Sequence, residues 1–302
     1  MAAGNAFRWL MVCAEKWVPV SMKDRAEVDS EPPGKIAVPG GDKTLMKGLM
    51  LIETMCRSSA SRGVSDLASE LSLTKSNVHR LLQTLITAGF VAKEADGDRY
   101  ELTSKLWRLS REPRSYDALL ALVHPLLGQL VAETGETATF VIIEGNNVIT
   151  MDQVETPHTV RVYYRVGDSQ RLDQVMRGGR GISAIQQIAF AFRPEVWARS
   201  ALEKIRGELG RPLAFVDEQL ARIEAVRRDG YAIVRGEWME GVNAVGAAVK
   251  GEAGKLIGIV ISFGPEQRLT GRDLNRVRDL TSGMAARLAE RLANDGPLRI
   301  DG

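Results

Sequence analysis

The fold of this chain can be worked out from residues 73–86, which read LTKSNVHRLLQTLI. Apolar residues recur here at intervals of three and four, the spacing that gathers side chains on one face of an α-helix. Thr74 is a suitable N-cap, and Gly89 suits the position after the last turn. A helix between them is therefore predicted, with one face packed on a core. The residues of that face are Val78, Leu81, Leu82, Leu85 and Ile86.

The opposite face of this helix is polar, and no acidic residue lies between Thr74 and Ala88. At about 100° per residue, Ser76, Arg80 and Gln83 point directly away from the apolar face. Cationic, amide and hydroxyl side chains are those that read base edges and phosphates in a major groove. An ordinary solvated helix face is the alternative. The predicted DNA-contacting residues of the helix are Thr74, Lys75, Ser76, Asn77, His79, Arg80 and Gln83.

The residues upstream complete a helix-turn-helix. A short helix is predicted over residues 66–71, with Ser65 as its cap. Only residues 72 and 73 then remain for a turn, so the two helices must cross steeply. Residues 45–56 have the apolar spacing of a third helix that covers the other two.

The residues downstream predict a wing. Residues 90–93 and 99–102 are short strand-like segments around an Asp96-Gly97 turn, which is a hairpin signal. Three helices followed by a hairpin make a winged helix-turn-helix. On this wing, Lys93 and Arg99 are predicted to contact DNA phosphates.

The remainder of the chain is predicted to be α+β. Residues 104–112 indicate a short linker helix, and residues 116–134 a longer one in which Pro125 requires either a kink or two consecutive helices. Runs of strands with helices segregated to the faces follow, which argues for α+β. The predicted strands are 139–143, 148–154 and 159–166, in an antiparallel meander, and then 231–235, 244–249 and 256–263. The predicted helices are 182–192, 194–206, 216–229 and 270–293.

Charge and cysteine content indicate how the chain could bind DNA and in which compartment it is expected. The chain has 40 Lys and Arg against 38 Asp and Glu, and the excess falls in residues 42–112, which have 11 against 9. So small an excess means that DNA affinity must come from where the cations lie and from pairing two subunits. Cys13 and Cys56 form neither a disulfide framework nor a metal spacing, so a reduced cytoplasm is expected.

Residues 1–41 are expected to be a disordered tail, or to precede a true start of translation at Met22. Their apolar patches are too short to span a bilayer and lack the arrangement of a signal peptide. No G-x-S-x-G or P-loop pattern indicates an enzyme, and His79, His124 and His158 have no metal-ligand spacing. Residues 179–184 fit G-x-G-x-x-A, but the preceding residues make a poor strand, so no dinucleotide cofactor is expected.

Several motifs in order resemble the IclR family of transcriptional regulators. The helix-turn-helix residues 64–82 and 85–91 match the amino-terminal domain of that family, and the resemblance extends over residues 42 to 292. It implies a GAF-like effector-binding domain and a linker helix that helps to pair subunits. The matching effector-domain motifs are 133–137, 152–158, 228–232, 240–245, 262–265 and 268–270. The predicted domains are a tail (1–41), the winged helix-turn-helix (42–103), the linker helix (104–115), the effector-binding domain (116–294) and a C-terminal tail (295–302).

The effector-binding positions depart from the family pattern. Asp173 replaces a histidine of the family, Ala244 a frequent cysteine, and Val234 a frequent acid. Ile261 and Phe263 replace serines, and the strand period of two places them on one side together with Ile257 and Ile259. Packing as ordinary core is the alternative for these side chains. The predicted effector-binding residues are Asp173, Met176, Gly178, Gly179, Val234, Ala244, Ile261 and Phe263.

The sequence therefore predicts a homodimeric or homotetrameric regulator without cofactor or membrane segment that binds double-stranded operator DNA. Its DNA affinity is expected to respond to a small-molecule effector with an apolar or aromatic body. Such a molecule would rest on Ile261 and Phe263, with one polar end near Asp173 or near the glycine loop, which is the loop at Gly178 and Gly179. The alternative is a GAF-like ligand-binding or enzymatic protein whose winged helix mediates protein contacts.

Overall fold

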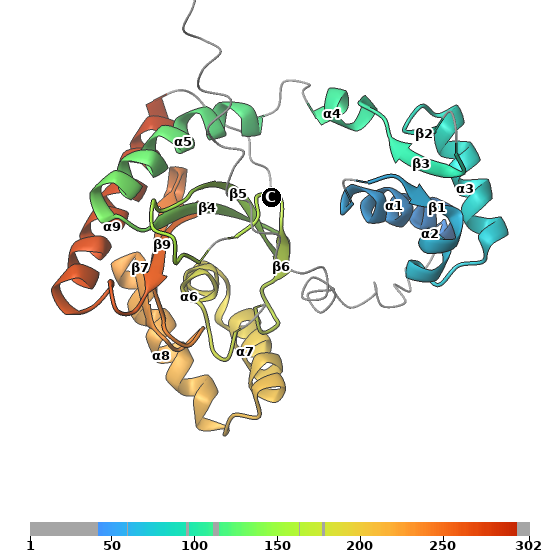
Figure 1. The fold of residues 1–302 in the computed structure, drawn as a ribbon. Helices are drawn as coiled ribbons and strands as arrows, with labels where there is room; N and C mark the ends of the chain where they lie inside the picture. The colour runs from blue at the N-terminus through green and yellow to red at the C-terminus, as the bar shows by residue number, and fades with distance from the viewer. Residues whose placement is uncertain are drawn as a thin grey trace, which may run out of the picture. The chain divides into compact units, whose positions relative to one another are not determined.

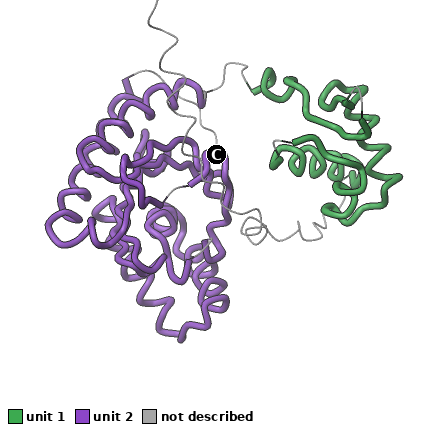
Figure 2. Tube along the Cα trace, viewed as in Figure 1, with its two compact units in different colours: residues 1–112 green, residues 113–302 purple. Residues whose placement is uncertain are grey.

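The computed structural model divides the chain into two compact units, residues 1–112 and residues 113–302 (Figure 2). Each unit has its own hydrophobic core and is described by itself. The predicted tails, residues 1–41 and 295–302, lie outside the described residues. The structure describes residues 42–58, 60–94, 97–110, 115–162, 164–176 and 179–294.

Three helices build the first unit: α1 (Lys43–Cys56), α2 (Val64–Glu70) and α3 (Lys75–Thr87). The apolar face predicted for α3 packs against α1 and α2, which confirms the three-helix arrangement (Figure 1). The buried residues at this contact include Leu51, Leu67, Val78, Leu81 and Leu82.

The ends of α3 agree with the sequence, whereas the start of α2 does not. Thr74 Oγ1 accepts a hydrogen bond from the Asn77 backbone amide at 3.3 Å, and Gly89 has a φ of +78° after the last turn. Ser65 was expected to cap α2, but α2 already begins at Val64, after Gly63 and without a side-chain cap. The prediction of a Ser65 cap was wrong because a strand runs directly into this helix.

A three-stranded antiparallel sheet forms the wing. The predicted hairpin corresponds to β2 (Val91–Lys93) and β3 (Arg99–Leu102), and part of its turn, residues 95 and 96, lies outside the described residues. A third strand, β1 (Arg62–Gly63), pairs with the other edge of β3. Two residues are too few to show a strand pattern, so the sequence did not predict β1.

Helix α4 (Lys105–Ser110) is shorter than the predicted linker helix, and residues 111–114 are not among the described ones. Its first turn is attached to the end of α3. Lys105 Nζ donates to the Ala88 carbonyl at 2.6 Å and lies 4.6 Å from the centre of the Phe90 ring. Thr103 Oγ1 donates to the Gly89 carbonyl at 2.6 Å. These contacts link the start of α4 directly to the last carbonyls of α3.

The second unit is built on a six-stranded antiparallel sheet of order β6-β5-β4-β9-β8-β7 (Figure 1). This arrangement confirms the predicted α+β class. Its strands are β4 (Thr137–Glu144), β5 (Asn147–Val154), β6 (Ser169–Arg171), β7 (Tyr231–Arg235), β8 (Val242–Lys250) and β9 (Leu256–Pro265).

Helices cover both faces of this sheet. One face carries α5 (Ser115–Thr134) and α9 (Gly271–Asn294). The other carries α6 (Ala184–Ala191), around which α7 (Glu195–Leu209) and α8 (Ala214–Asp229) pack (Figure 1). Within the described residues, none of the helices is long and apolar enough to cross a bilayer.

Pro125 lies inside α5, which continues through it as one helix rather than dividing into two. Proline removes only one backbone donor, and the apolar residues before and after it all face the same core. Leu119, Val123, Leu126 and Leu130 are buried there. Packing of this face therefore maintains a helix that proline alone would weaken.

The described residues of the segment 159–166, which are 159–162 and 164–166, are not in a strand, and this corrects the predicted meander. The third strand is instead β6, which pairs with β5 from Ser169 onward. Side chains satisfy part of the segment's backbone: Gln153 Oε1 accepts from the Tyr164 amide at 2.9 Å, and Arg268 donates to the Val160 carbonyl at 3.1 Å. Its β-branched composition indicated a strand, but these long-range partners replace strand pairing.

One side chain on β9 lies on the opposite face from that predicted. Ile259, Ile261 and Phe263 belong to the core on the α6 side, as the period of two requires. Ile257 instead packs on the α5 and α9 side. The register between β8 and β9 shifts by one residue beside Lys250, and such a bulge reverses the direction of every side chain beyond it.

Candidate functional site

The outward face of α3 is exposed along its length. Ser76, Arg80, Gln83 and His79 are all exposed, together with Lys75 in the first turn. Within the part of the chain that the structure describes, no hydrogen bond or ion pair engages the side chains of Lys75, His79 or Arg80. These cationic and imidazole groups are therefore available to a partner outside the helix.

Other polar side chains of α3 are already engaged or covered. Thr84 Oγ1 donates to the Arg80 carbonyl at 3.1 Å, and Thr87 Oγ1 to the Gln83 carbonyl at 3.0 Å. Asn77 is partly buried, and its Oδ1 atom is covered without a hydrogen-bond partner. Of the predicted DNA-contacting residues, Asn77 therefore presents its acceptor least well.

The two predicted wing residues have partners within the wing. Lys93 Nζ lies 2.9 Å from Asp98 Oδ1, and the hydrogen bond and charge of Asp98 raise the pKa of Lys93. Arg99 donates to the Ser61 carbonyl from Nη2 at 2.7 Å and from Nε at 3.1 Å. Arg99 thus holds β1 beside the hairpin, and its charge lies on the same unit as α3.

Four of the predicted effector-binding residues gather on the α6 side of the sheet. Val234, Ala244, Ile261 and Phe263 are all buried in the same core. The Tyr164 ring meets Phe263 edge-on, with 5.2 Å between the ring centres. These four side chains are at most 4% exposed, so they form closed packing in this structure.

Asp173 is buried but does not present an unbalanced charge. Its carboxylate lies 2.9 Å from Arg171 and 2.6 Å from Lys204. Burial alone would raise its pKa, but hydrogen bonds from Arg171, Lys204 and Asn146 lower the pKa to about 2. The charge of Asp173 is therefore offset by its two cationic partners. Lys204 lies on α7, so the sequence alone could not reveal this pairing.

Hydrogen bonds hold the described residues on both sides of Gly178. The Gly179 amide donates to the Met176 carbonyl at 2.7 Å. The sequence suggested that the glycine loop could receive the polar end of a ligand, but this amide is already engaged. Met176 Sδ accepts from Ser183 Oγ at 2.9 Å. Gln186, in the first turn of α6, donates to the carbonyls of Leu172 and Gln174 at 3.0 and 2.9 Å. Gly178 lies outside the described residues.

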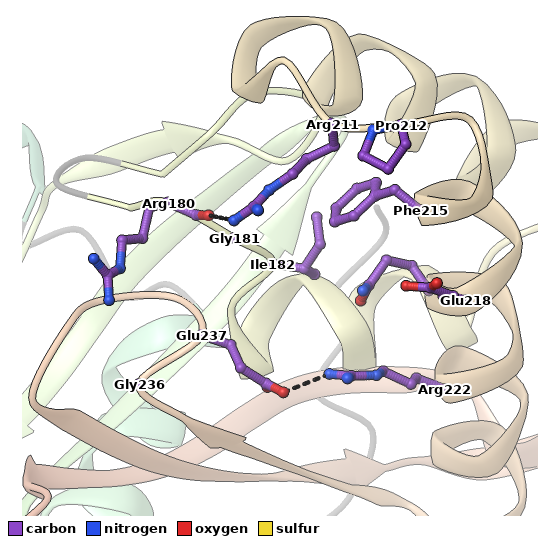
Figure 3. Close-up of a pocket in the computed structure, with 11 residues that line it drawn as sticks. Arg180, Gly181, Ile182, Arg211, Pro212, Phe215, Glu218, Arg222, Gly236 and Glu237 are labelled. Carbon is purple, nitrogen blue, oxygen red and sulfur yellow. Dashed lines mark hydrogen bonds and ion pairs between the residues drawn. The ribbon is translucent and has the colours of Figure 1, made fainter.

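An open cleft of about 430 Å³ lies beside this loop (Figure 3). Ile182, Pro212 and Phe215 supply apolar wall, and Arg211 crosses it to donate to the Arg180 carbonyl at 3.2 Å. The cleft joins three segments far apart in sequence, which is why no motif predicted it. Its remaining lining residues are Gly181, Glu218, Gln219, Arg222, Gly236 and Glu237.

Two solved structures share this fold. An IclR transcriptional regulator from Alicyclobacillus acidocaldarius has a TM-score of 0.65 and 22% identity, over 83% of this chain and 98% of that one. An IclR homolog from Microbacterium hydrocarbonoxydans, solved in complex with 4-hydroxybenzoate, has a TM-score of 0.65 and 16% identity. That match covers 82% of this chain and 98% of the homolog.

Sequence comparison gives the same family. The HTH-type transcriptional regulator KdgR of Dickeya chrysanthemi is 25% identical over 204 residues, which are 67% of this chain and 64% of KdgR. The IclR helix-turn-helix domain matches residues 44–95, and the bacterial transcriptional regulator IclR C-terminal domain matches residues 115–289. Because that second match alone covers more than half of the chain, the protein belongs to the IclR family of bacterial transcriptional regulators.

Proposed function

We propose that this chain binds double-stranded operator DNA in the cytoplasm through α3 and the wing, and that a small molecule with an aromatic or apolar body controls that binding. The acid-free, exposed face of α3 carries the proposal. Arg80 and Lys75 have no acidic partner in the described residues, so their full charge is available to DNA. Arg80 at the centre of the face is assigned to a base, and Lys75 in the first turn to a phosphate.

The chain is proposed to act as a homo-oligomer. One winged helix with a small positive excess gives weak binding, and two half-sites on one duplex multiply the contacts. Two apolar residues of α1, Leu45 and Leu49, are 63% and 47% exposed, and Leu109 of α4 is 44% exposed. Exposed apolar side chains of this kind favour burial against a second subunit, and their exposure supports the proposal.

The proposed effector site lies on the α6 side of the sheet. A short oxo-acid needs several convergent donors to replace the water that its carboxylate loses. Val234, Ala244, Ile261 and Phe263 offer none, so an apolar or aromatic body fits these walls better. The related regulator that binds 4-hydroxybenzoate supports an aromatic ligand class for this chain.

A ligand changes DNA affinity only if it binds one arrangement of the protein better than another. The contacts of Lys105 and Thr103 with the end of α3 support α4 as the transmitting element. Movement of α4 would displace the last turn of α3 directly, because Lys105 holds the Ala88 carbonyl.

Two experiments test this function. DNase I footprinting on the region upstream of the gene should show a protected site whose occupancy falls steeply with salt. Isothermal titration against aromatic acids and short oxo-acids should give binding only to the aromatic set. Salt-insensitive binding without sequence preference would contradict the DNA reading, and binding of pyruvate or glyoxylate with no aromatic ligand would contradict the effector class.

A further inference from the structure

Trp238 has a buried donor without an acceptor. Its side chain lies in the loop between β7 and β8 and is only 3% exposed. Its indole Nε1 is covered by protein and has no hydrogen-bond partner among the described residues. A buried N–H group without a partner costs free energy, so such groups in native proteins often mark a place where another molecule binds.

The surroundings of this donor are those of the proposed effector site. The Trp238 ring stacks on Tyr164 with 6.0 Å between centres, and Tyr164 meets Phe263 edge-on. The Cδ1 and Nε1 edge of the indole faces Gly179, where an added Cβ would lie 3.0 Å from both atoms. Only glycine allows the loop to approach this edge so closely. The N–H edge of the indole therefore faces Gly179, and the face of the ring lies on Tyr164.

The other polar anchors of this region are already used. Asp173 is paired with Arg171 and Lys204, and the Gly179 amide donates to the Met176 carbonyl. A ligand that rests on Phe263 thus finds neither of the two anchors that the sequence suggested. The indole N–H of Trp238 is a buried donor beside this aromatic cluster that has no acceptor among the described residues.

We propose that Trp238 is the specificity-determining residue of the effector site, and that its indole N–H donates to the acceptor oxygen of an aromatic carboxylate or phenol. This inference rests on the proposed function, because it assigns the polar contact of the same effector. The ligand body would replace part of the contact between Trp238, Tyr164 and Phe263, whose rings already favour aromatic neighbours.

A ligand would reach this site by displacing the loop that carries Trp238. Gly236 and Gly241 bound the loop with φ values of +66° and +71°. A backbone hydrogen bond, from the Arg180 amide to the Trp238 carbonyl at 2.7 Å, holds the loop. Two exposed ion pairs also hold it: Arg222 lies 2.7 Å from Glu237, and Arg180 lies 2.7 Å from Glu240. Exposed pairs of this kind contribute little to stability. Gly236 and Glu237 also line the open cleft (Figure 3). The loop therefore borders the cleft on one side and carries the buried Trp238 ring.

The test is isothermal titration of the full-length chain with 4-hydroxybenzoate and benzoate as probes. Trp238→Phe keeps an aromatic ring and removes only the donor and the second ring. Loss of a buried hydrogen bond to a charged acceptor should weaken binding by roughly tenfold or more. Trp197→Phe is the matched control, because Trp197 packs edge-on against Phe190 at 5.6 Å, away from Tyr164 and Phe263. Its affinity should equal that of the wild type.

If Trp238→Phe does not fold, the wild type gives the answer directly. In a saturated complex of the ¹⁵N-tryptophan-labelled protein, one indole proton should show a nuclear Overhauser effect to the ring protons of 4-hydroxybenzoate. That signal should persist in Trp197→Phe. A saturated complex with no indole contact would overturn the assignment of Trp238.

The outcomes separate this inference from the proposed function. Equal affinity in Trp238→Phe and the wild type overturns the role of Trp238 and leaves an aromatic effector in place. A wild type that binds neither probe, and binds a short oxo-acid instead, overturns the aromatic effector and this inference together. Tenfold weaker binding in Trp238→Phe alone supports both.

Discussion

The outer face of α3 and the α6 side of the sheet treat polar groups in opposite ways. On α3, Lys75 and Arg80 extend from an exposed surface without an acidic partner. On the α6 side of the sheet, Asp173 is buried and paired with Arg171 and Lys204, and the core there is apolar. The cations of α3 are thus left without an acidic partner among the described residues. On the α6 side of the sheet, the buried indole N–H of Trp238 is left without an acceptor.

The largest expected effect is on stability, from a substitution in the core on the α6 side of the sheet. Phe263 is 1% exposed, and truncation to Phe263→Ala should lower the free energy of unfolding by about 3–5 kcal/mol through lost contacts and a cavity. Urea unfolding of the second unit measures it. Val196→Ala, at a side chain that is 83% exposed, should stay near wild type. A loss below about 1 kcal/mol for Phe263→Ala would mean that this side chain is not packed as core.

A smaller effect is expected for Arg80, on the exposed face of α3. If Arg80 contacts a base, Arg80→Ala should weaken operator binding by about 1–3 kcal/mol and leave the free energy of unfolding unchanged. Fluorescence anisotropy with the footprinted DNA gives the affinity. Substitution of Thr87, whose hydroxyl is bonded to the Gln83 carbonyl, should change the affinity much less. Equal losses at both positions would remove the distinction between free and engaged side chains.

Acid should release the pairing of Asp173. The pKa of this carboxyl is lowered from 3.8 to about 2 in the folded chain, so its contribution is present above about pH 4 and is lost as pH falls toward 2. The loss should be at most about 2 kcal/mol. Unfolding of the wild type and Asp173→Asn is compared between pH 2 and pH 5. The difference between them should shrink as pH falls, and a constant difference would show that the carboxylate is not stabilised by its partners.

The smallest effect is expected for two lysines of the winged helix, Lys75 and Lys93. Lys75 has no acidic partner in the described residues, whereas Lys93 lies 2.9 Å from Asp98. Lys75→Ala should reduce the slope of log affinity against log salt by about one. Lys93→Ala should reduce it by less, because Asp98 already offsets part of the charge. The same reduction for both would show that the Lys93 pair opens on DNA.

The helix-turn-helix could be predicted from sequence because its signals are local. The spacing of Val78, Leu81 and Leu82, the Thr74 cap and the glycine after the helix are all contained in one short stretch. The residues on its exposed face follow from the same periodicity. Among the described residues, no partner engages the side chains of Lys75, His79 or Arg80, so their exposure could be predicted too.

The sensor region could be predicted only in part because its signals are not local. The strands β4, β5, β7, β8 and β9 follow from composition, but a bulge beside Lys250 reverses Ile257. The strand expected at residues 159–166 is replaced by contacts with Gln153 and Arg268. Residues distant in sequence decide each of these outcomes.

The site residues show the same limit. The apolar positions Val234, Ala244, Ile261 and Phe263 do gather in one core, as the strand period required. Asp173 and the Gly179 amide instead have partners within the protein that no sequence spacing could reveal. Trp238 could not be predicted because a single tryptophan in a loop forms no sequence pattern. Its unpaired N–H is visible only when its neighbours are in place.

The exposed side chains of α3 that have no partner in the described residues, above all Arg80, are proposed to read a DNA sequence. The most direct test measures the binding of wild type and Arg80→Ala to every single-base variant of the footprinted operator. A base contact predicts that Arg80→Ala loses discrimination at one position of each half-site and keeps it elsewhere. A uniform loss of affinity across all variants, with discrimination unchanged, would contradict the claim and reduce Arg80 to a phosphate contact.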